Sequence, residues 1–186
     1  VIGQMMEKVV LPEQRTRLTD EEVIARCPWA TTGRTHHRTP NIITSLELDP
    51  AEMEKRNIHL QKKYAEIEEN EVRFEELHCE DAEYLIVAFG SCARIAQKAM
   101  EMAREEGIKV GLLRPITLWP FPSKAIAARA AQVKGILTVE LNAGQMVEDV
   151  RLAVKCKVPV EHFGRLGGIV PDPDEVITAL KEKLIK

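Results

Sequence analysis

Apolar runs of strand length alternate with helical patterns through the last part of the chain. An uninterrupted apolar stretch predicts a strand at 84–89, and shorter or mixed stretches rich in apolar residues predict strands at 108–113, 136–139 and 158–163. The segments after them have helical periodicity and capping residues, at 93–106, 123–133, 144–154 and 171–184. Continuous apolar strands joined by helices are typical of a mostly parallel sheet covered on both faces. We therefore predict a three-layer α/β/α domain for residues 84–186.

Residues 49–83 carry the pattern of one long, acidic helix. Asp49 is placed to cap the helix, and Pro50 suits its first turn. Apolar or neutral residues recur at alternating steps of four and three, at Met53, Asn57, Leu60, Tyr64 and Ile67. This spacing predicts a single stripe on a helix of roughly 20 residues. Because the stripe is narrow and its surroundings are charged, we expect this connecting helix to lie across another domain or chain.

Residues 1–48 lack sustained periodicity. Residues 9–11 are compatible with a short strand, and Thr19 followed by acidic residues predicts one helical turn with an N-cap. Prolines and polar residues fill the rest of the segment. A compact domain rarely contains so long a stretch without its own elements. We interpret it as an extended arm or linker that packs against another surface, with Trp29 inserted into a partner; a disordered tail is the alternative.

Charge is distributed unevenly along the 186 residues. The net charge of -3 combines a balanced arm, a net of -7 over 49–83 and a net of +4 over 84–186. Mean hydropathy is -0.19, and the longest uncharged apolar stretch is far shorter than the roughly 20 residues that a bilayer requires. The composition therefore predicts a soluble protein without a membrane span, and the absence of a basic excess argues against a nucleic-acid partner.

The cysteines favour a reduced, cytoplasmic environment. Four cysteines lie far apart, at Cys27, Cys79, Cys92 and Cys156, so no CxxC pair is available for zinc or an iron–sulfur cluster. No signal peptide pattern opens the chain. The first residue is a valine, which suggests a piece of a longer protein. We expect mostly buried thiols and cytoplasmic localisation.

Candidate site residues follow two of the predicted strands. In doubly wound sheets ligands bind at the carboxyl ends of the strands. Gly90 and Ser91 end the first strand, but they lack the further glycines of a dinucleotide fingerprint, so a tight turn with Ser91 as N-cap is favoured. Glu140, Asn142 and Gln145 follow the third strand and are placed to reach a cleft or a neighbouring subunit. Capping of the next helix is the expected role of Asn142.

Other reactive residues give weaker signals. Cys92, at a helix N-terminus beside Arg94, is expected to have a lowered pKa, yet no histidine lies near it in sequence to support a nucleophile. The five histidines lack metal-ligand spacing, and residues 164–168 (GRLGG) lack the Lys-Ser/Thr pair of a phosphate loop. We therefore assign no catalytic, cofactor-binding or metal-binding residue.

Three motifs resemble one enzyme family. Residues 84–91 (YLIVAFGS), 111–122 (GLLRPITLWPFP) and 139–145 (VELNAGQ) are similar to the transketolase C-terminal-like domain of the alpha subunit of 2-oxoacid:ferredoxin oxidoreductases. Residues 3–6 and 28–33 also resemble the segment that leaves the preceding thiamine-pyrimidine domain in that subunit. The GRLGG segment with Pro171 is most similar to the 2-oxoisovalerate, or branched-chain, type; the 2-oxoglutarate type is the alternative.

The resemblance implies a function for the whole enzyme and a different one for this part. It implies oxidative decarboxylation of a 2-oxoacid to an acyl-coenzyme A, with ferredoxin as electron acceptor and with thiamine diphosphate, magnesium and iron–sulfur clusters as cofactors. The family's thiamine motif and cluster cysteines are absent from this sequence. The resemblance therefore implies a structural, subunit-interface role that is inactive alone, next to a beta subunit that binds thiamine diphosphate.

Two other functions stay open at this point. A stand-alone nucleotide-binding or regulatory α/β module would use the Gly90-Ser91 turn before its helix. A pure interaction protein would use the acidic helix from Asp49 as its docking surface.

Overall fold

A computed structural model describes residues 11, 13–30 and 41–185. Two compact units divide the chain, one ending at Leu60 and the other beginning at Gln61. The first unit contains helix α1 (Asp20–Arg26), which has a complete capping box between Thr19 and Glu22. The predicted N-cap at Thr19 is thus confirmed. The short strand predicted at 9–11 falls almost wholly outside the described residues.

Helix α2 (Pro50–Asn70) confirms the long helix predicted from Asp49. The Asp49 Oδ1 atom accepts hydrogen bonds from the backbone N–H groups of Ala51, at 2.8 Å, and Glu52, at 3.2 Å. Along the predicted stripe Met53, Leu60 and Ile67 are half-buried, while Asn57 and Tyr64 are exposed. The helix ends well before residue 83, the limit predicted for the acidic segment.

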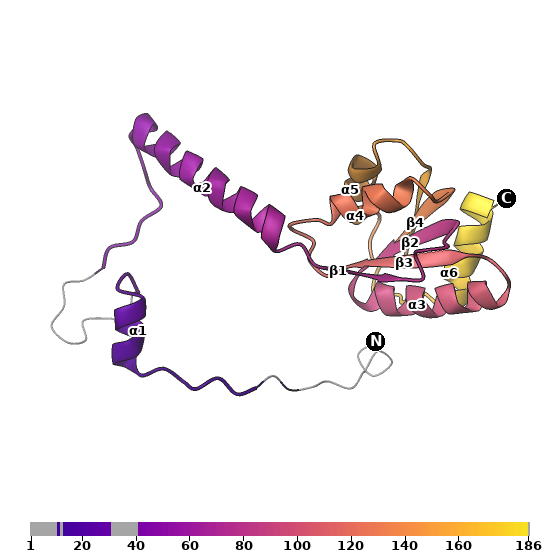
Figure 1. Cartoon of the computed structure of the whole chain (residues 1–186), viewed down its shortest axis with the longest axis horizontal. Coiled ribbons are helices and arrows are strands. Elements are labelled where there is room, and N and C mark those ends of the chain that lie inside the picture. Colours follow the sequence, from indigo (N-terminus) through magenta and orange to yellow (C-terminus); the bar gives the residue numbers. More distant parts are fainter. Residues whose placement is uncertain (1–10, 12, 31–40, 186) are drawn as a thin grey trace. The chain divides into compact units, whose positions relative to one another are not determined.

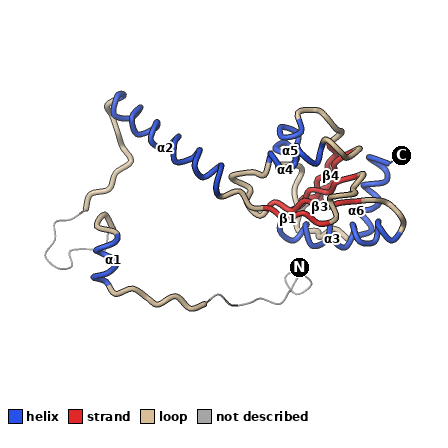
Figure 2. The backbone as a smooth tube through the Cα atoms, in the orientation of Figure 1, coloured by secondary structure: helices blue, strands red, loops and turns tan. Residues whose placement is uncertain are grey.

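A five-stranded sheet forms the centre of the second unit, with strand order β1-β3-β2-β4-β5 (Figures 1 and 2). Strands β2 to β5 are parallel, and β1 pairs antiparallel with β3. The strands are β1 (Phe74–Leu77), β2 (Tyr84–Ala88), β3 (Val110–Pro115), β4 (Gly135–Glu140) and β5 (Val160–Gly164). The mostly parallel sheet predicted from the four apolar runs is confirmed.

Helices cover both faces of this sheet (Figure 1). One core joins Ile86 and Ala88 of β2 to α3 (Gly90–Glu105) and α6 (Pro173–Leu180). The other joins Leu85 and Val87 of the same strand to α4 (Ser123–Ala130) and α5 (Met146–Val154). Because successive strand residues point to opposite faces, the apolar run of β2 supplies both cores. This arrangement confirms the predicted three-layer α/β/α fold.

Several predicted boundaries and caps are wrong in detail. The N-cap of α4 is Pro122 and no side chain caps this helix, because Ser123 is itself the first helical residue. Helix α4 ends at Ala130, and α6 continues only as a single π-helical turn, η3 (Lys181–Ile185). Gly107, which follows the predicted helix 93–106, adopts a φ of 84° directly after the C-cap residue Glu106. That left-handed conformation is the reason a glycine suits the position.

Strand β1 is an element that the sequence pattern did not predict. Its residues, Phe-Glu-Glu-Leu, are half acidic, and they join the edge of the sheet beside Leu112 to Pro115 of β3. The Arg129 guanidinium on α4 forms two hydrogen bonds to the Glu76 carboxylate, at 2.9 and 2.6 Å. Charged residues are common on edge strands. Here one of the charges also ties the edge to the helix layer.

Candidate functional site

The predicted site residues lie where the strand order of the parallel sheet reverses. Strand β2 is central, with β3 on one side and β4 on the other. The carboxyl ends of β2 and β4 therefore flank the position at which doubly wound folds open a crevice. Gly90 and Ser91 directly follow β2, and Glu140 is the last residue of β4. The topology thus brings together two sequence segments that are some 50 residues apart.

The Glu140 carboxylate is the centre of this region. It is only 1% exposed and accepts three backbone hydrogen bonds. Its Oε2 atom accepts from the N–H groups of Gln145, at 3.1 Å, and Met146, at 2.9 Å, and its Oε1 atom from that of Val147, at 3.0 Å. These are the free donors of the first turn of α5, so Glu140 caps this helix from the preceding strand.

The capping role predicted for Asn142 is therefore wrong. Its Oδ1 atom accepts a hydrogen bond from the N–H of Gly144, at 2.7 Å, which closes the turn before the helix. Gln145 occupies the N-cap position, but its side chain makes no capping bond. Asn142 was a reasonable candidate because it is close in sequence to the start of α5. The acceptor that bonds the first N–H groups of α5 is instead the buried Glu140 carboxylate at the end of β4.

His162 on β5 forms a second layer around Glu140. Its Nδ1 atom lies 3.4 Å from Oε1 of Glu140 and 3.2 Å from Oγ1 of Thr138. Its Nε2 atom lies 3.3 Å from the backbone oxygen of Asn142. The imidazole thus connects the buried carboxylate to the turn that follows it. In sequence His162 is one of five histidines without metal-ligand spacing, and its contacts could not be predicted because Thr138 and Glu140 are on another strand.

The end of β2 differs from its prediction. Helix α3 begins at Gly90, with φ 55°, and Phe89 is its N-cap without a side-chain hydrogen bond. The N-cap predicted at Ser91 is therefore wrong. Cys92 is 3% exposed, and burial together with the nearby Glu140 charge raises its pKa to about 11. The lowered pKa predicted for Cys92 is also wrong, because the thiol is buried in the core on the side of an anionic carboxylate.

The side chains at this edge of the sheet hold a turn in place rather than face a substrate. The Glu140 oxygens are occupied by backbone donors and His162, so the carboxylate is not directed at a substrate. Leu141, Ala143 and Gln145 of the turn are exposed, whereas Met146 and Val147 are buried. Glu140 therefore fixes the conformation of a turn that presents its side chains outward.

The described residues do not offer a metal or cluster site. No three His, Cys, Asp or Glu side chains among them are grouped so as to hold a metal ion. Within the same part of the chain, Cys79 and Cys92 are buried, Cys27 is half-buried and Cys156 is exposed, all as free cysteines. Iron–sulfur clusters require several convergent thiolates. No described helix is both long and apolar enough to cross a bilayer.

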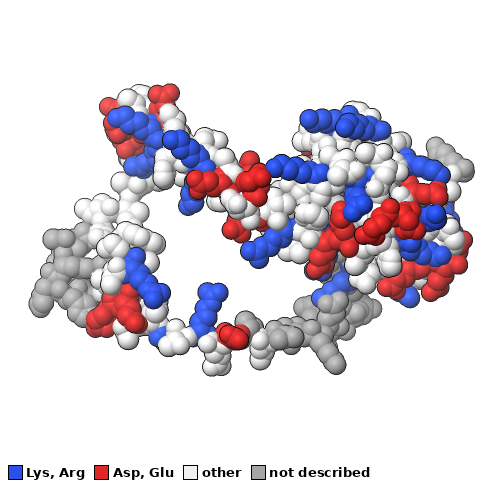
Figure 3. Space-filling model, viewed as in Figure 1, with Lys and Arg blue, Asp and Glu red and all other residues white. Residues whose placement is uncertain are grey.

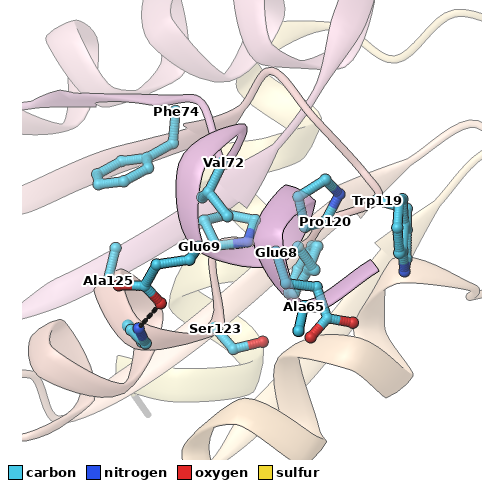
Figure 4. Close-up of a pocket in the computed structure, with 12 residues that line it drawn as sticks. Ala65, Glu68, Glu69, Val72, Phe74, Trp119, Pro120, Ser123 and Ala125 are labelled. Carbon is cyan, nitrogen blue, oxygen red and sulfur yellow. Dashed lines mark hydrogen bonds and ion pairs between the residues drawn. The ribbon is translucent and has the colours of Figure 1, made fainter. Parts of the chain in front are cut away.

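An open groove of about 950 Å³ lies elsewhere on the second unit (Figure 4). One wall is the end of α2 with the chain that leads into β1, and the other is the loop between β3 and α4 with the first turn of α4. Its apolar lining includes Val72, Phe74 and Trp119. From sequence, residues 111–122 were recognisable only as a family motif and not as a groove wall, since the contact of this loop with α2 depends on the tertiary fold.

Comparison with known proteins identifies the family. The model of the pyruvate:ferredoxin oxidoreductase core domain II matches residues 82–176, just over half of the chain. The chain belongs to this family. The predicted relationship to 2-oxoacid:ferredoxin oxidoreductases is thereby confirmed. The Glu140 and His162 region lies wholly within the matched domain II segment, whereas the groove lies partly outside it.

The similar proteins of known identity are subunits of such oxidoreductases. Ketoisovalerate oxidoreductase subunit VorB of Methanothermobacter thermautotrophicus is 43% identical over 182 residues, which are 98% of this chain and 50% of VorB. The 2-oxoglutarate synthase subunit KorA of Archaeoglobus fulgidus is 30% identical over 175 residues, 92% of this chain and 48% of KorA. This domain II chain therefore spans about half the length of the curated relatives that it matches.

Solved structures agree with the fold. The 2-oxoglutarate:ferredoxin oxidoreductase from Magnetococcus marinus, with 2-oxoglutarate, coenzyme A and succinyl-CoA bound, has a TM-score of 0.67 and 25% identity. The match covers 80% of this chain and 27% of that one. A split-gene transketolase, at 20% identity and a TM-score of 0.53, shares the fold. The transketolase C-terminal-like architecture of domain II is thus confirmed.

Proposed function

We propose that the chain is the transketolase C-terminal-like part of a subunit of a 2-oxoacid:ferredoxin oxidoreductase that acts on 2-oxoisovalerate. The observation that carries this proposal is the 43% identity to ketoisovalerate oxidoreductase subunit VorB, which extends over 98% of the chain. The similarity includes the arm as well as domain II. The arm, residues 1–48, would then connect domain II to a preceding thiamine-pyrimidine domain, and the assembly would work in the cytoplasm.

The whole enzyme would convert a 2-oxoacid and coenzyme A to an acyl-coenzyme A and carbon dioxide. The bond to the carboxylate carbon would break with release of carbon dioxide, the acyl carbon would form a thioester as the thiol proton is released, and the two electrons would pass to ferredoxin. Thiamine diphosphate would supply the stabilisation of the carbanion formed on decarboxylation. The described residues provide no set of ligands for its magnesium ion or for iron–sulfur clusters. Those groups would therefore be held by other parts of the enzyme, including the beta subunit.

This part would have a structural role. Glu140 and His162 hold the turn between β4 and α5 in place, and Leu141 and Gln145 are exposed at its surface. We propose that this edge, with Gly90, Ser91 and Asn142, contacts a neighbouring domain or subunit. Side chains that organise an exposed turn suit an interface better than a catalytic centre, because the Glu140 carboxylate and the His162 imidazole are both engaged within the fold.

Reconstitution tests the proposed function. The complete subunit is expressed with a beta subunit that carries the thiamine motif, and reduction of ferredoxin is followed with 2-oxoisovalerate and coenzyme A. The complex is expected to reduce ferredoxin, and the 186-residue chain alone is expected to be inactive. Full activity of the isolated chain would contradict the proposal.

A 2-oxoglutarate-specific enzyme is the second candidate. It is favoured by the structural match to the Magnetococcus marinus enzyme and by the 30% identity to KorA. The ratio of kcat/KM for 2-oxoisovalerate to that for 2-oxoglutarate separates the two proposals, since a ratio below one would favour the 2-oxoglutarate type. A stand-alone nucleotide-binding module would instead show a thermal shift with adenine nucleotides, and we expect none.

A further inference from the structure

We infer that the groove between the end of α2 and the loop after β3 is a docking site for another polypeptide. The occupant is a segment that combines apolar side chains with an arginine or lysine. The inference rests on the proposed function only in assigning that segment to another subunit of the oxidoreductase. Everything else about it follows from the groove itself.

Specific contacts hold the two walls of the groove in place. The Tyr64 ring on α2 meets the Trp119 ring edge to face, with centroids 5.7 Å apart and an interplanar angle of 87°. The Lys124 Nζ atom at the start of α4 lies 2.8 Å from Oε2 of Glu69 on α2. The N–H of Arg73 donates to Oγ1 of Thr117, at 3.0 Å. Side chains from both segments therefore form one surface with a defined shape.

Large apolar side chains around this groove are exposed. Trp119 is 56% exposed, and exposure is also substantial for Phe74, Ile116 and Leu118. Figure 4 shows Phe74 and Trp119 on opposite sides of the groove, with Val72 and Pro120 between them. An exposed cluster of this kind is typical of a surface that another protein covers. Aromatic rings at the centre of such a surface commonly contribute most of the binding energy.

The charges at the groove point to a cationic side chain on the occupant. Ala65, Glu68 and Glu69 lie on one face of α2, with Glu68 and Glu69 three and four residues after Ala65, and Val72 follows just after the helix ends. The Glu69 carboxylate is paired with Lys124, whereas that of Glu68 has no ion-pair partner among the described residues. A dashed line at the Glu69 carboxylate marks this ion pair in Figure 4. One carboxylate is thus left available in the groove that Trp119 also lines.

Acidic side chains gather along the C-terminal part of α2 (Figure 3). Glu71 and Glu75 nearby pair with Arg73 and Arg114, whereas Glu66, like Glu68, has no ion-pair partner among the described residues. An arginine or lysine can stack on an exposed tryptophan and pair with a nearby carboxylate. Two copies of this chain facing each other through the groove would instead place both Glu68 carboxylates in one interface without a complementary cation. The charge therefore favours a different polypeptide over a second copy.

A peptide titration tests the inference without any other subunit. In the full chain carrying Trp29→Phe, Trp119 is the only tryptophan, and its fluorescence reports occupation of the groove. The probe is an acetylated and amidated peptide in which leucine alternates with arginine. The comparison peptide has glutamate in place of arginine. We expect the arginine peptide to bind at least tenfold more tightly.

Substitutions locate the binding. Glu68→Lys is expected to weaken binding of the arginine peptide about tenfold, whereas Glu105→Lys, on the exposed last turn of α3, makes the same change in net charge and is expected to have little effect. Calorimetry with Trp119→Ala is expected to show a similar loss, and Leu152→Ala, an exposed apolar residue of α5, none. Thermal unfolding confirms that each variant is folded.

Three results would overturn the inference. They are equal affinity for the two peptides, no binding at millimolar concentration, and equal effects of Glu68→Lys and Glu105→Lys. None of these outcomes bears on ferredoxin reduction by the reconstituted complex. Failure of the groove assignment is therefore distinguishable from failure of the proposed function.

Discussion

The carboxylate of Glu140 and the imidazole of His162 meet across two neighbouring strands, with Oε1 of Glu140 3.4 Å from Nδ1 of His162. The parallel register of β4 and β5 pairs Thr138 with His162 and Glu140 with Gly164. His162 therefore lies beside the end of β4. This contact lets the buried carboxylate cap α5 while the imidazole supports the turn that follows it.

Replacement of Glu140 by glutamine should destabilise domain II. The amide keeps one oxygen but places an NH₂ group against buried backbone donors, so at least one of the three N–H bonds is lost. An unsatisfied buried donor costs about 1–3 kcal/mol. We expect the free energy of unfolding in urea to fall by about 2 kcal/mol. Glu148→Gln, at an exposed position in the same helix turn, should cost a few tenths at most; equal losses in the two variants would contradict the capping role of Glu140.

A side chain at Gly164 should disrupt the contact between β5 and the turn. A Cβ atom there would lie 2.2 Å from the backbone oxygen of Asn142 and 2.6 Å from Nε2 of His162. Backbone must then move, and we expect Gly164→Ala to lower the thermal unfolding midpoint by several degrees. Gly135→Ala is the matched control, because its Cβ would meet only the end of the Leu184 side chain, at 2.8 Å. A larger effect at Gly135 would count against this account.

The ion pair between Glu76 and Arg129 should contribute measurably to stability. Both side chains are 22% exposed, and the guanidinium contacts both carboxylate oxygens. We expect Glu76→Gln to lower the free energy of unfolding by about 1–2 kcal/mol, since a partly buried, bidentate pair is stronger than a solvated one. Glu101→Gln removes the exposed pair with Lys98 and should change stability by less than about 0.5 kcal/mol. Similar values for both would show that β1 is not anchored through Glu76.

Thiol labelling should separate the cysteines by burial. Cys156 is exposed and should react rapidly with iodoacetamide near pH 8 in the native chain. Cys92 should react only on unfolding, because burial raises its pKa to about 11 and also excludes the reagent. Mass spectrometry of peptides after timed labelling measures both rates. Comparable labelling of Cys92 and Cys156 would contradict the burial of Cys92 in the core.

Stability should decrease at alkaline pH because of Cys79 and Cys92. Burial raises the pKa of each thiol from 9.0 to about 11 in the folded chain. Between these values the unfolded chain releases protons that the folded chain retains, so stability falls as pH rises from about 9 to about 11. Urea unfolding across this range measures the decrease. A variant with both residues changed to alanine should show a smaller pH-dependent loss, and an unchanged slope would assign the effect to other groups.

Local pattern was sufficient for most of the elements. The apolar runs correspond to β2 to β5, and the helical segments after them correspond to α3 to α6. These elements were predictable because strand and helix periodicities depend on residues close together in sequence. The caps at Thr19 and Asp49 were also predictable, since capping side chains bond donors only two or three residues away. The relationship to 2-oxoacid:ferredoxin oxidoreductases could also be predicted, from motifs in the same segments.

Contacts between distant segments decided the remainder. Strand β1 has too few apolar residues to be recognised, and it exists because β3 offers an edge to which its backbone can bond. Glu140, and not Asn142, caps α5, because the strand order places its carboxylate at the start of that helix. Burial and the nearby Glu140 carboxylate also raise the pKa of Cys92. The groove at Trp119 likewise requires α2 to meet a loop some 50 residues later in the chain. Sequence determined which elements form; the packing of the sheet and its helices determined which side chains lie close enough to interact.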